Sequence, residues 1–223
     1  MLLKLAGVLA PDELAELRGL FAQGEVESGR STAAGSAARV KDNLQLADGE
    51  ELGRARRIVL GALERNPVFR AAAQPARLSP PRFARYDAGM RYGDHLDSPH
   101  MGRPGDLLRA DVSVTVFVAD AADYEGGELV VDTDYGLLPV KLAAGSCVLY
   151  PSDKFHRVEE VSRGTRLVAV LWVQSLVADT ARRKLLFDLA GAIEYLDRFG
   201  KADGQLEVVR RCHANLLRMW SQP

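Results

Sequence analysis

The residues with the clearest chemical potential are a histidine and an aspartate two positions apart, in Tyr86-Asp-Ala-Gly-Met-Arg-Tyr-Gly-Asp-His95-Leu-Asp97. In an extended chain, residues i and i+2 point to the same side, so the two side chains can converge on one point. One imidazole and one carboxylate are two thirds of the 2-His-1-carboxylate set that binds non-haem Fe(II) and leaves positions open. A His-x-Asp triplet also arises often by chance, so the pair alone does not establish a metal site.

Any of the other histidines could complete this set. His100 lies in a loop-like stretch five residues after His95, which favours an exposed residue or one beside the ligands. His213 falls on an amphipathic tail segment, which favours a half-buried helix residue. His156 follows Tyr150-Pro-Ser-Asp-Lys-Phe, a predicted turn between two strands, so a barrel can return it to the strand of His95. His156 is therefore the predicted third ligand.

An arginine, Arg166, follows His156 by ten residues on the next predicted strand. A buried guanidinium is costly unless it is paired, and its fork matches a carboxylate bidentately. His-x-Asp, a later His and an Arg ten positions on form the arrangement used by Fe(II)/2-oxoglutarate oxygenases. There, 2-oxoglutarate chelates the iron through its 1-carboxylate and 2-oxo group, the arginine holds its 5-carboxylate, and O₂ takes the remaining position.

The segments around these residues predict a β-rich core. Asp111–Val118 alternates strictly, with Asp111, Ser113 and Thr115 on one face and valines on the other. This pattern suits a strand with one face toward a polar lumen and the other under helices. Many short strands at near-regular spacing indicate a sandwich or barrel, with a jelly roll as the leading candidate. The other predicted strands are 82–86, 128–132, 137–142, 146–150, 156–161 and 166–174.

Helical patterns lie on both sides of this core, so the predicted fold class is α+β. Pro11-Asp12-Glu13 has the composition of a helix start, and a second helix is predicted at 49–65. Gly24–Ala38 is predicted to be a loop. Two amphipathic helices are predicted around 185–196 and 206–217. The predicted organisation is N-terminal helices and a cover strand (1–77), a β core (78–176) and a C-terminal helical extension (177–223).

The cover strand is predicted from the alternating run Arg39-Val-Lys-Asp-Asn-Leu-Gln-Leu. Its spacing places Arg39, Lys41 and Asn43 on one face. That face contacts substrate if the strand covers the mouth of the barrel, and it faces water otherwise. A solvated face is the favoured interpretation.

The composition excludes several classes of partner. Among 223 residues, 29 basic and 30 acidic side chains nearly cancel, which argues against nucleic acid and against an anionic membrane surface. Cys147 and Cys212 show no spacing motif, which argues for a reducing compartment and against a cysteine zinc site. The apolar run Met1–Ala10 is too short to span a bilayer. We therefore expect a cytoplasmic protein with no membrane or nucleic-acid partner.

The chain also resembles a known family, the PKHD-type hydroxylases, named for similarity to prolyl/lysyl hydroxylase domains. The resemblance extends from Tyr86 to the tail helices. It implies a double-stranded β-helix (jelly-roll, cupin-like) core, iron on His95, Asp97 and His156, and 2-oxoglutarate on Arg166. Besides these site residues it rests on Tyr86-x-x-Gly89-x-x-Tyr92, Arg109-x-Asp111-x-Ser113-x-Thr115-x-Phe117, Tyr124-Glu-Gly-Gly-Glu-Leu129, Gly145-Ser-Cys-Val-Leu-Tyr-Pro-Ser152, Gly164 and Trp172-x-Gln174-Ser175.

The resemblance carries further expectations. Tyr86 lies nine residues before His95, where prolyl hydroxylase-like enzymes place a tyrosine that reaches the cosubstrate; a barrel-filling aromatic is an equal alternative, and Tyr92 could do the same. O₂ is the second cosubstrate, and ascorbate is a candidate reductant. Members of the family are linked with bacterial iron uptake and iron starvation.

The predicted function is therefore a hydroxylase that couples oxidation of an unidentified substrate to decarboxylation of 2-oxoglutarate to succinate. Peptidyl proline and a siderophore-like small molecule are both open as substrates. A non-catalytic sensor that binds iron or 2-oxoglutarate on the same barrel is the main alternative. A zinc hydrolase ranks last, because Arg166 would then have no task. The apolar tail helices either pack on the barrel or form the interface of a homodimer.

Overall fold

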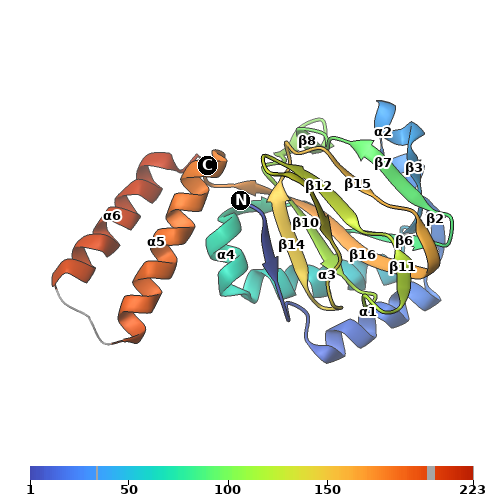
Figure 1. Ribbon diagram of the computed structural model, residues 1–223, viewed down its shortest axis with the longest axis horizontal. Helices are drawn as coiled ribbons and strands as arrows, with labels where there is room; N and C mark the ends of the chain where they lie inside the picture. Colours follow the sequence, from blue (N-terminus) through green and yellow to red (C-terminus); the bar gives the residue numbers. More distant parts are fainter. Residues whose placement is uncertain (34, 200–203, 223) are drawn as a thin grey trace.

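Two antiparallel sheets form the centre of the molecule (Figure 1), a computed structural model that describes residues 1–33, 35–199 and 204–222. The larger sheet has nine strands, and its central strand β16 pairs with β10 on one side and β6 on the other. In sheet order its path is β1 (Leu3–Leu5), β14 (Cys147–Pro151), β10 (Val112–Phe117), β16 (Val161–Ser175), β6 (Arg82–Asp87), β4 (Leu44–Leu46) and β2 (Val26–Ser28), and β5 (Pro75–Leu78) and β11 (Tyr124–Gly126) also pair with β16.

The smaller sheet faces the interior of the barrel from the other side. Its order is β13 (Gly136–Val140), β12 (Leu129–Thr133), β15 (His156–Val158), β7 (Arg91–His95) and β3 (Lys41–Asp42). A separate hairpin, β8 (His100–Arg103) with β9 (Asp106–Arg109), follows β7. Two antiparallel sheets around one interior are a jelly roll, so the predicted α+β jelly-roll fold is confirmed.

Three N-terminal helices cover the outer face of the larger sheet: α1 (Pro11–Gln23), α3 (Glu50–Arg65) and α4 (Pro67–Ala73). The alternation of β10 has the predicted result. Val112, Val114 and Val116 pack in one apolar core with side chains of these helices, whereas Ser113 and Thr115 line the interior of the barrel. The sheet is thus held from outside by apolar burial, and its inner face is left for polar groups.

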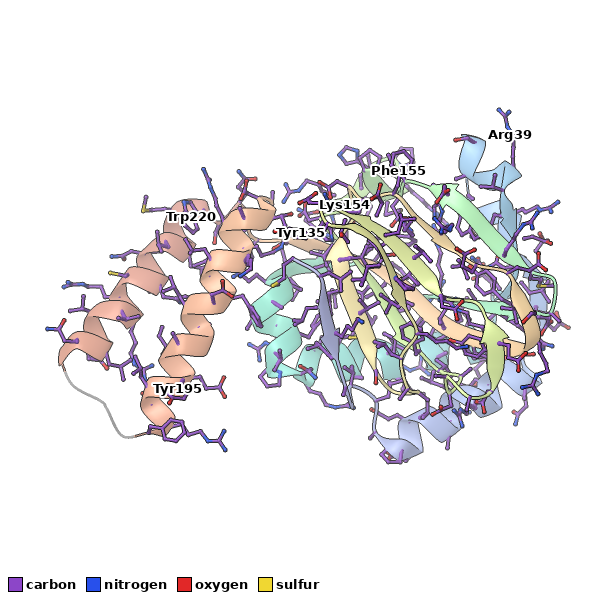
Figure 2. All side chains as sticks on the ribbon, in the orientation of Figure 1. Arg39, Tyr135, Lys154, Phe155, Tyr195 and Trp220 are labelled. Atoms are coloured by element: carbon purple, nitrogen blue, oxygen red, sulfur yellow. The ribbon has the colours of Figure 1, made fainter. Side chains whose placement is uncertain are left out.

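The predicted cover strand and the loop before it differ from expectation. The segment 24–38 contains β2, a 3₁₀ turn η1 (Gly29–Thr32) and the start of α2 (Gly35–Arg39). The chain then enters the smaller sheet as β3 and crosses to the larger sheet as β4, so no single strand exists. Arg39 points into solvent (Figure 2). Lys41 and Asn43 are 5% and 3% exposed, so the predicted solvated face is wrong for both.

The C-terminal pair is α5 (Thr180–Arg198) and α6 (Gly204–Trp220), which stand as a hairpin beside the barrel (Figure 1). Asp179 caps α5 by accepting a hydrogen bond from the backbone N–H of Arg182. The buried guanidinium of Arg183 donates to the carbonyls of Val177 and Ala178, which fixes the start of the hairpin to the end of β16. No helix among the described residues is long and apolar enough to cross a membrane.

Candidate metal and cosubstrate site

His95 and His156 lie on the neighbouring antiparallel strands β7 and β15, directly opposite each other. Nδ1 of His95 is 2.9 Å from the carbonyl oxygen of Gly93, and Nδ1 of His156 is 3.1 Å from that of Lys154. A histidine that donates its Nδ1 proton to a carbonyl is held with Nε2 deprotonated and free to bind a metal. Both rings are buried, so each has one available nitrogen in one fixed direction.

Asp97 completes the cluster. Its carboxylate oxygen Oδ2 is 3.7 Å from Nε2 of His156, and it accepts a hydrogen bond of 2.7 Å from the hydroxyl of Ser113 on β10. Ser113 is in turn 2.9 Å from the hydroxyl of Ser152. The opposite sheet therefore orients the carboxylate toward the histidine pair.

The three side chains fit a divalent metal by geometry and by charge state. One ligand atom from each of His95, Asp97 and His156 lies within 4.8 Å of the others. Burial, together with the neighbouring His156, lowers the pKa of His95 to about 4. The neutral imidazole, which is the metal-binding form, is thus favoured at neutral pH. Two histidines and one carboxylate on one side of an ion are the arrangement typical of non-haem Fe(II) sites with open positions.

Arg166 on β16 is the largest fully buried side chain among the described residues, with 1% of its surface exposed. Its guanidinium carbon lies 5.1 Å from the ring centroid of Tyr86 and 5.8 Å from that of Phe117. Nε has no hydrogen-bond partner among the described residues. A buried arginine with an unused donor is expensive unless a ligand provides an oxyanion. A carboxylate such as that of 2-oxoglutarate fits this requirement.

The two tyrosines near the metal cluster have different places. Tyr86 pairs with Arg166 across β6 and β16 and lies buried beneath its guanidinium. Burial raises the pKa of its phenol, which the positive charge of Arg166 partly offsets. Tyr92 instead stacks on His95 at 3.6 Å between ring centroids. Tyr86 is therefore the tyrosine beside the predicted cosubstrate anchor, and Tyr92 positions a histidine.

A cavity of about 330 Å³ joins the metal cluster to Arg166. It is lined from both sheets and roofed by η1, α2 and the segment after Asp97. His100 lies exposed at its rim, and His213 is on α6 outside it. Sequence reasoning missed Tyr150, Arg82 and Trp172 in the wall. Arg82 and Trp172 could have been found from strand periodicity, since Arg82 is four residues before Tyr86 and Trp172 is six after Arg166, and even spacings share a face.

The comparisons place this site in a class. Residues 81–174 match the model of the 2OG-Fe(II) oxygenase superfamily, a range that contains all five predicted site residues. The fold is similar to that of a solved prolyl hydroxylase from Trichoplax adhaerens, in complex with a peptide fragment of the hypoxia inducible factor oxygen degradation domain. The TM-score is 0.59 at 14% identity, over 78% of this chain and 83% of that one. The family model, together with the full-length relatives described next, makes the chain an Fe(II)/2-oxoglutarate-dependent dioxygenase.

Proteins similar to this chain over its whole length define its family within the superfamily. A PKHD-type hydroxylase of Thermosynechococcus vestitus is 46% identical over 100% of both chains. Another, from Hyphomonas neptunium, is 46% identical over 99% of both. This protein belongs to the PKHD-type hydroxylases, as the resemblance predicted. The cofactors of the superfamily are Fe(II), 2-oxoglutarate and O₂, and the His–Asp–His cluster suits the metal.

Proposed function

We propose that His95, Asp97 and His156 hold the iron and that Arg166 binds the 5-carboxylate of 2-oxoglutarate, with Tyr86 beside it. On this assignment the protein hydroxylates its substrate while 2-oxoglutarate is decarboxylated to succinate. The observation that carries the proposal is a pair of histidines whose Nδ1 atoms are engaged by backbone carbonyls and which face one carboxylate. The same cavity contains a buried arginine whose Nε has no hydrogen-bond partner among the described residues.

Bound iron with its cosubstrates would supply the oxidising chemistry. The contribution of this chain is position and exclusion of water. The carbonyls of Gly93 and Lys154 fix the histidine rings, and the Ser113 hydroxyl fixes the carboxylate of Asp97. The apolar wall around Phe117 keeps water from the Arg166 guanidinium, which strengthens its interaction with a carboxylate.

Two substrate classes are compatible with the proposed site. The structurally similar prolyl hydroxylase from Trichoplax adhaerens is in complex with a peptide, which supports a peptidyl substrate. A siderophore-like small molecule, with a link to iron homeostasis and ascorbate as reductant, is the other substrate class that we carry forward. Residues 78–176 would form the catalytic core. A homodimer through α5 and α6 and a cytoplasmic location stay predictions from the sequence.

The test is an anaerobic titration with Fe(II) and 2-oxoglutarate, followed by the visible charge-transfer band of the chelated keto acid. The parent protein should develop the band and, on exposure to air, form succinate. Asp97→Ala and His156→Ala should abolish both, while Arg166→Ala should raise the 2-oxoglutarate concentration required. His213→Ala, on α6 outside the cavity, is the matched control. Parental succinate formation by both ligand variants would refute the assignment.

The same experiment separates an enzyme from a sensor. A sensor would show the charge-transfer band with no succinate under air, whatever substrate is added. The family membership favours turnover.

A further inference from the structure

A second cationic centre lies in the cavity, apart from Arg166. It consists of Lys41 on β3 and Arg82 on β6. The Lys41 ammonium donates to the hydroxyl of Thr32 at 3.0 Å, and an N–H of Arg82 donates to the carbonyl of the same residue at 2.8 Å. One residue of η1 therefore holds both cations against the same wall. The proposed metal and cosubstrate roles use neither of them.

Neither cation forms a salt bridge with any residue that the structure describes, and the carboxylate of Asp97 acts on both only at a distance. Lys41 is nevertheless only 5% exposed. Burial and the charge of Arg82 lower the pKa of Lys41 to about 8, opposed by Asp97. The aromatic contacts, Lys41 over Tyr92 at 5.2 Å and Arg82 over Trp172 at 5.0 Å, offset only part of the cost. Buried charges are normally paired, so buried Lys41 and half-buried Arg82 fit an anionic partner.

The charge of the whole cavity supports this reading. Three cationic side chains line it, Lys41, Arg82 and Arg166, against the single carboxylate of Asp97. Divalent iron and dianionic 2-oxoglutarate would cancel each other. A net charge of two positive units therefore remains in the site after iron and cosubstrate are bound. We assign it to Lys41 and Arg82, which lie apart from Arg166.

The strand register separates the two cationic centres. Arg82 pairs with Val170, whereas Tyr86 pairs with Arg166. Four residues of strand correspond to about 13 Å, so Arg82 lies nearer the mouth than Arg166. Trp172, which stacks on Arg82, pairs with Ser113, the residue that holds Asp97. Lys41 and Arg82 are thus close to the depth of the metal ligands, where a substrate must enter.

We infer that Lys41 and Arg82 bind an oxyanion of the substrate, a carboxylate or a phosphate ester, and that Trp172 positions Arg82 for this contact. The inference rests on the proposed function, since it takes Arg166 as the cosubstrate anchor. It defines the substrate class as anionic and places the anion on the wall formed by β3 and β6. A neutral or cationic substrate would leave buried Lys41 and half-buried Arg82 without an anionic partner.

The test uses Trp172 as an internal reporter. The chain has two tryptophans, so Trp220→Phe leaves Trp172 alone. This variant, loaded anaerobically with Fe(II) and 2-oxoglutarate, is titrated with propionate, methyl phosphate and neutral propionamide at constant ionic strength. The fluorescence of Trp172 should change saturably with one or both anions and not with the amide. The anion that binds more tightly shows whether the oxyanion of the substrate is a carboxylate or a phosphate ester.

Variants then locate the binding. Lys41→Met and Arg82→Gln should each weaken the anion roughly tenfold or more, the effect expected for losing a hydrogen bond to a charged group. Lys41→Arg should retain binding, which guards against a variant that merely misfolds. Arg39→Gln is the matched control, because Arg39 is a nearby cation that points into solvent (Figure 2). Equal anion binding by parent, Lys41→Met and Arg82→Gln would overturn the inference.

The charge-transfer band distinguishes this failure from failure of the proposed function. If Lys41→Met and Arg82→Gln lose the band while Arg166→Ala keeps it, these two cations hold 2-oxoglutarate and the inference is wrong. If the parent forms no band, the proposed function fails. The fluorescence titration with metal alone would then still show whether Lys41 and Arg82 bind an anion.

Discussion

His95 and His156 are direct partners across β7 and β15, and their ring centroids are 4.2 Å apart. Sixty-one positions separate them in the chain, so the pairing depends entirely on the register of two short strands. A slip of one residue would turn either ring to the other face of the sheet. The two histidine rings of the proposed metal site are thus placed by backbone hydrogen bonds before any metal arrives.

Removal of the Ser113 hydroxyl should weaken metal binding without removing a ligand. Ser113→Ala deletes the 2.7 Å hydrogen bond to Asp97, and loss of such an orienting contact typically costs about 10–100-fold in metal affinity. Titration with Fe(II) under anaerobic conditions measures this. Ser98→Ala, whose hydroxyl donates to the carbonyl of His100, should bind metal like the parent. Equal affinities of the two variants would contradict the proposed role of Ser113.

Gly127→Ala should disturb the position of Arg166. Gly127 has φ +65°, and an added Cβ would lie 2.9 Å from a methyl of Val161 and 3.1 Å from Cδ of Arg166. Backbone strain and overpacking together should lower the free energy of unfolding by roughly 1–3 kcal/mol. The concentration of 2-oxoglutarate required for succinate formation should rise as well.

A second glycine separates the two causes. Gly136 also has positive φ (+104°), but nothing lies within 4 Å of an added Cβ. Gly136→Ala should therefore lose stability in urea unfolding with no change in the 2-oxoglutarate requirement. The same increase in both variants would mean that Gly127 acts on the fold alone.

Lys41 should make stability depend on pH at the alkaline end. In the native protein burial lowers the pKa of Lys41 to about 8, whereas the ordinary value for an unfolded lysine is 10.5. In this interval the unfolded state binds more protons, so stability rises with pH, by at most about 3 kcal/mol. At pH 7 Lys41→Met should be the more stable protein, and the wild type should recover this difference between pH 8 and 10.5. Urea unfolding at both ends measures it, with Lys4→Met, exposed on β1, as the control.

The two thiols should react very differently. Cys147 is fully buried on β14, and burial raises the pKa of its thiol to about 12. Cys212 is exposed on α6. Since the thiolate is the reactive form, a chromogenic disulfide reagent at pH 8 should label one thiol rapidly in the native protein and two in denaturant. Rapid labelling of two thiols in the native state would mean that β14 opens readily.

The candidate site was predictable from the sequence where the period of a strand decides to which side a side chain points. His95 and Asp97 share a face because they are two residues apart. The lumen-facing side of β10 was predictable for the same reason. These inferences need only the strand, not its neighbours.

Lys41 and Asn43 could not be placed in this way. The chain changes sheets between them, and which side chain points inward depends on the strand that each segment pairs with. Register with distant strands is a tertiary property that one sequence does not reveal.

Helix α4, in contrast, had a local signal. Asn66 accepts a hydrogen bond from the backbone N–H of Phe69, and Pro67 is the first helical residue. The dipeptide that ends α3 therefore also begins the next helix, because asparagine caps a helix start and proline fits its first position.

The length of β16 has an evolutionary consequence. This one strand of 15 residues carries Arg166 and Trp172 on the same face, about 20 Å apart between Cα atoms at ordinary strand spacing. Hydrogen bonds to strands on both sides fix that separation. Relatives that accept larger or smaller substrates would therefore not change the distance between cosubstrate and mouth. Adaptation to a new substrate should occur in η1, α2 and the segment after Asp97. The lengths of these three segments can vary without moving β16.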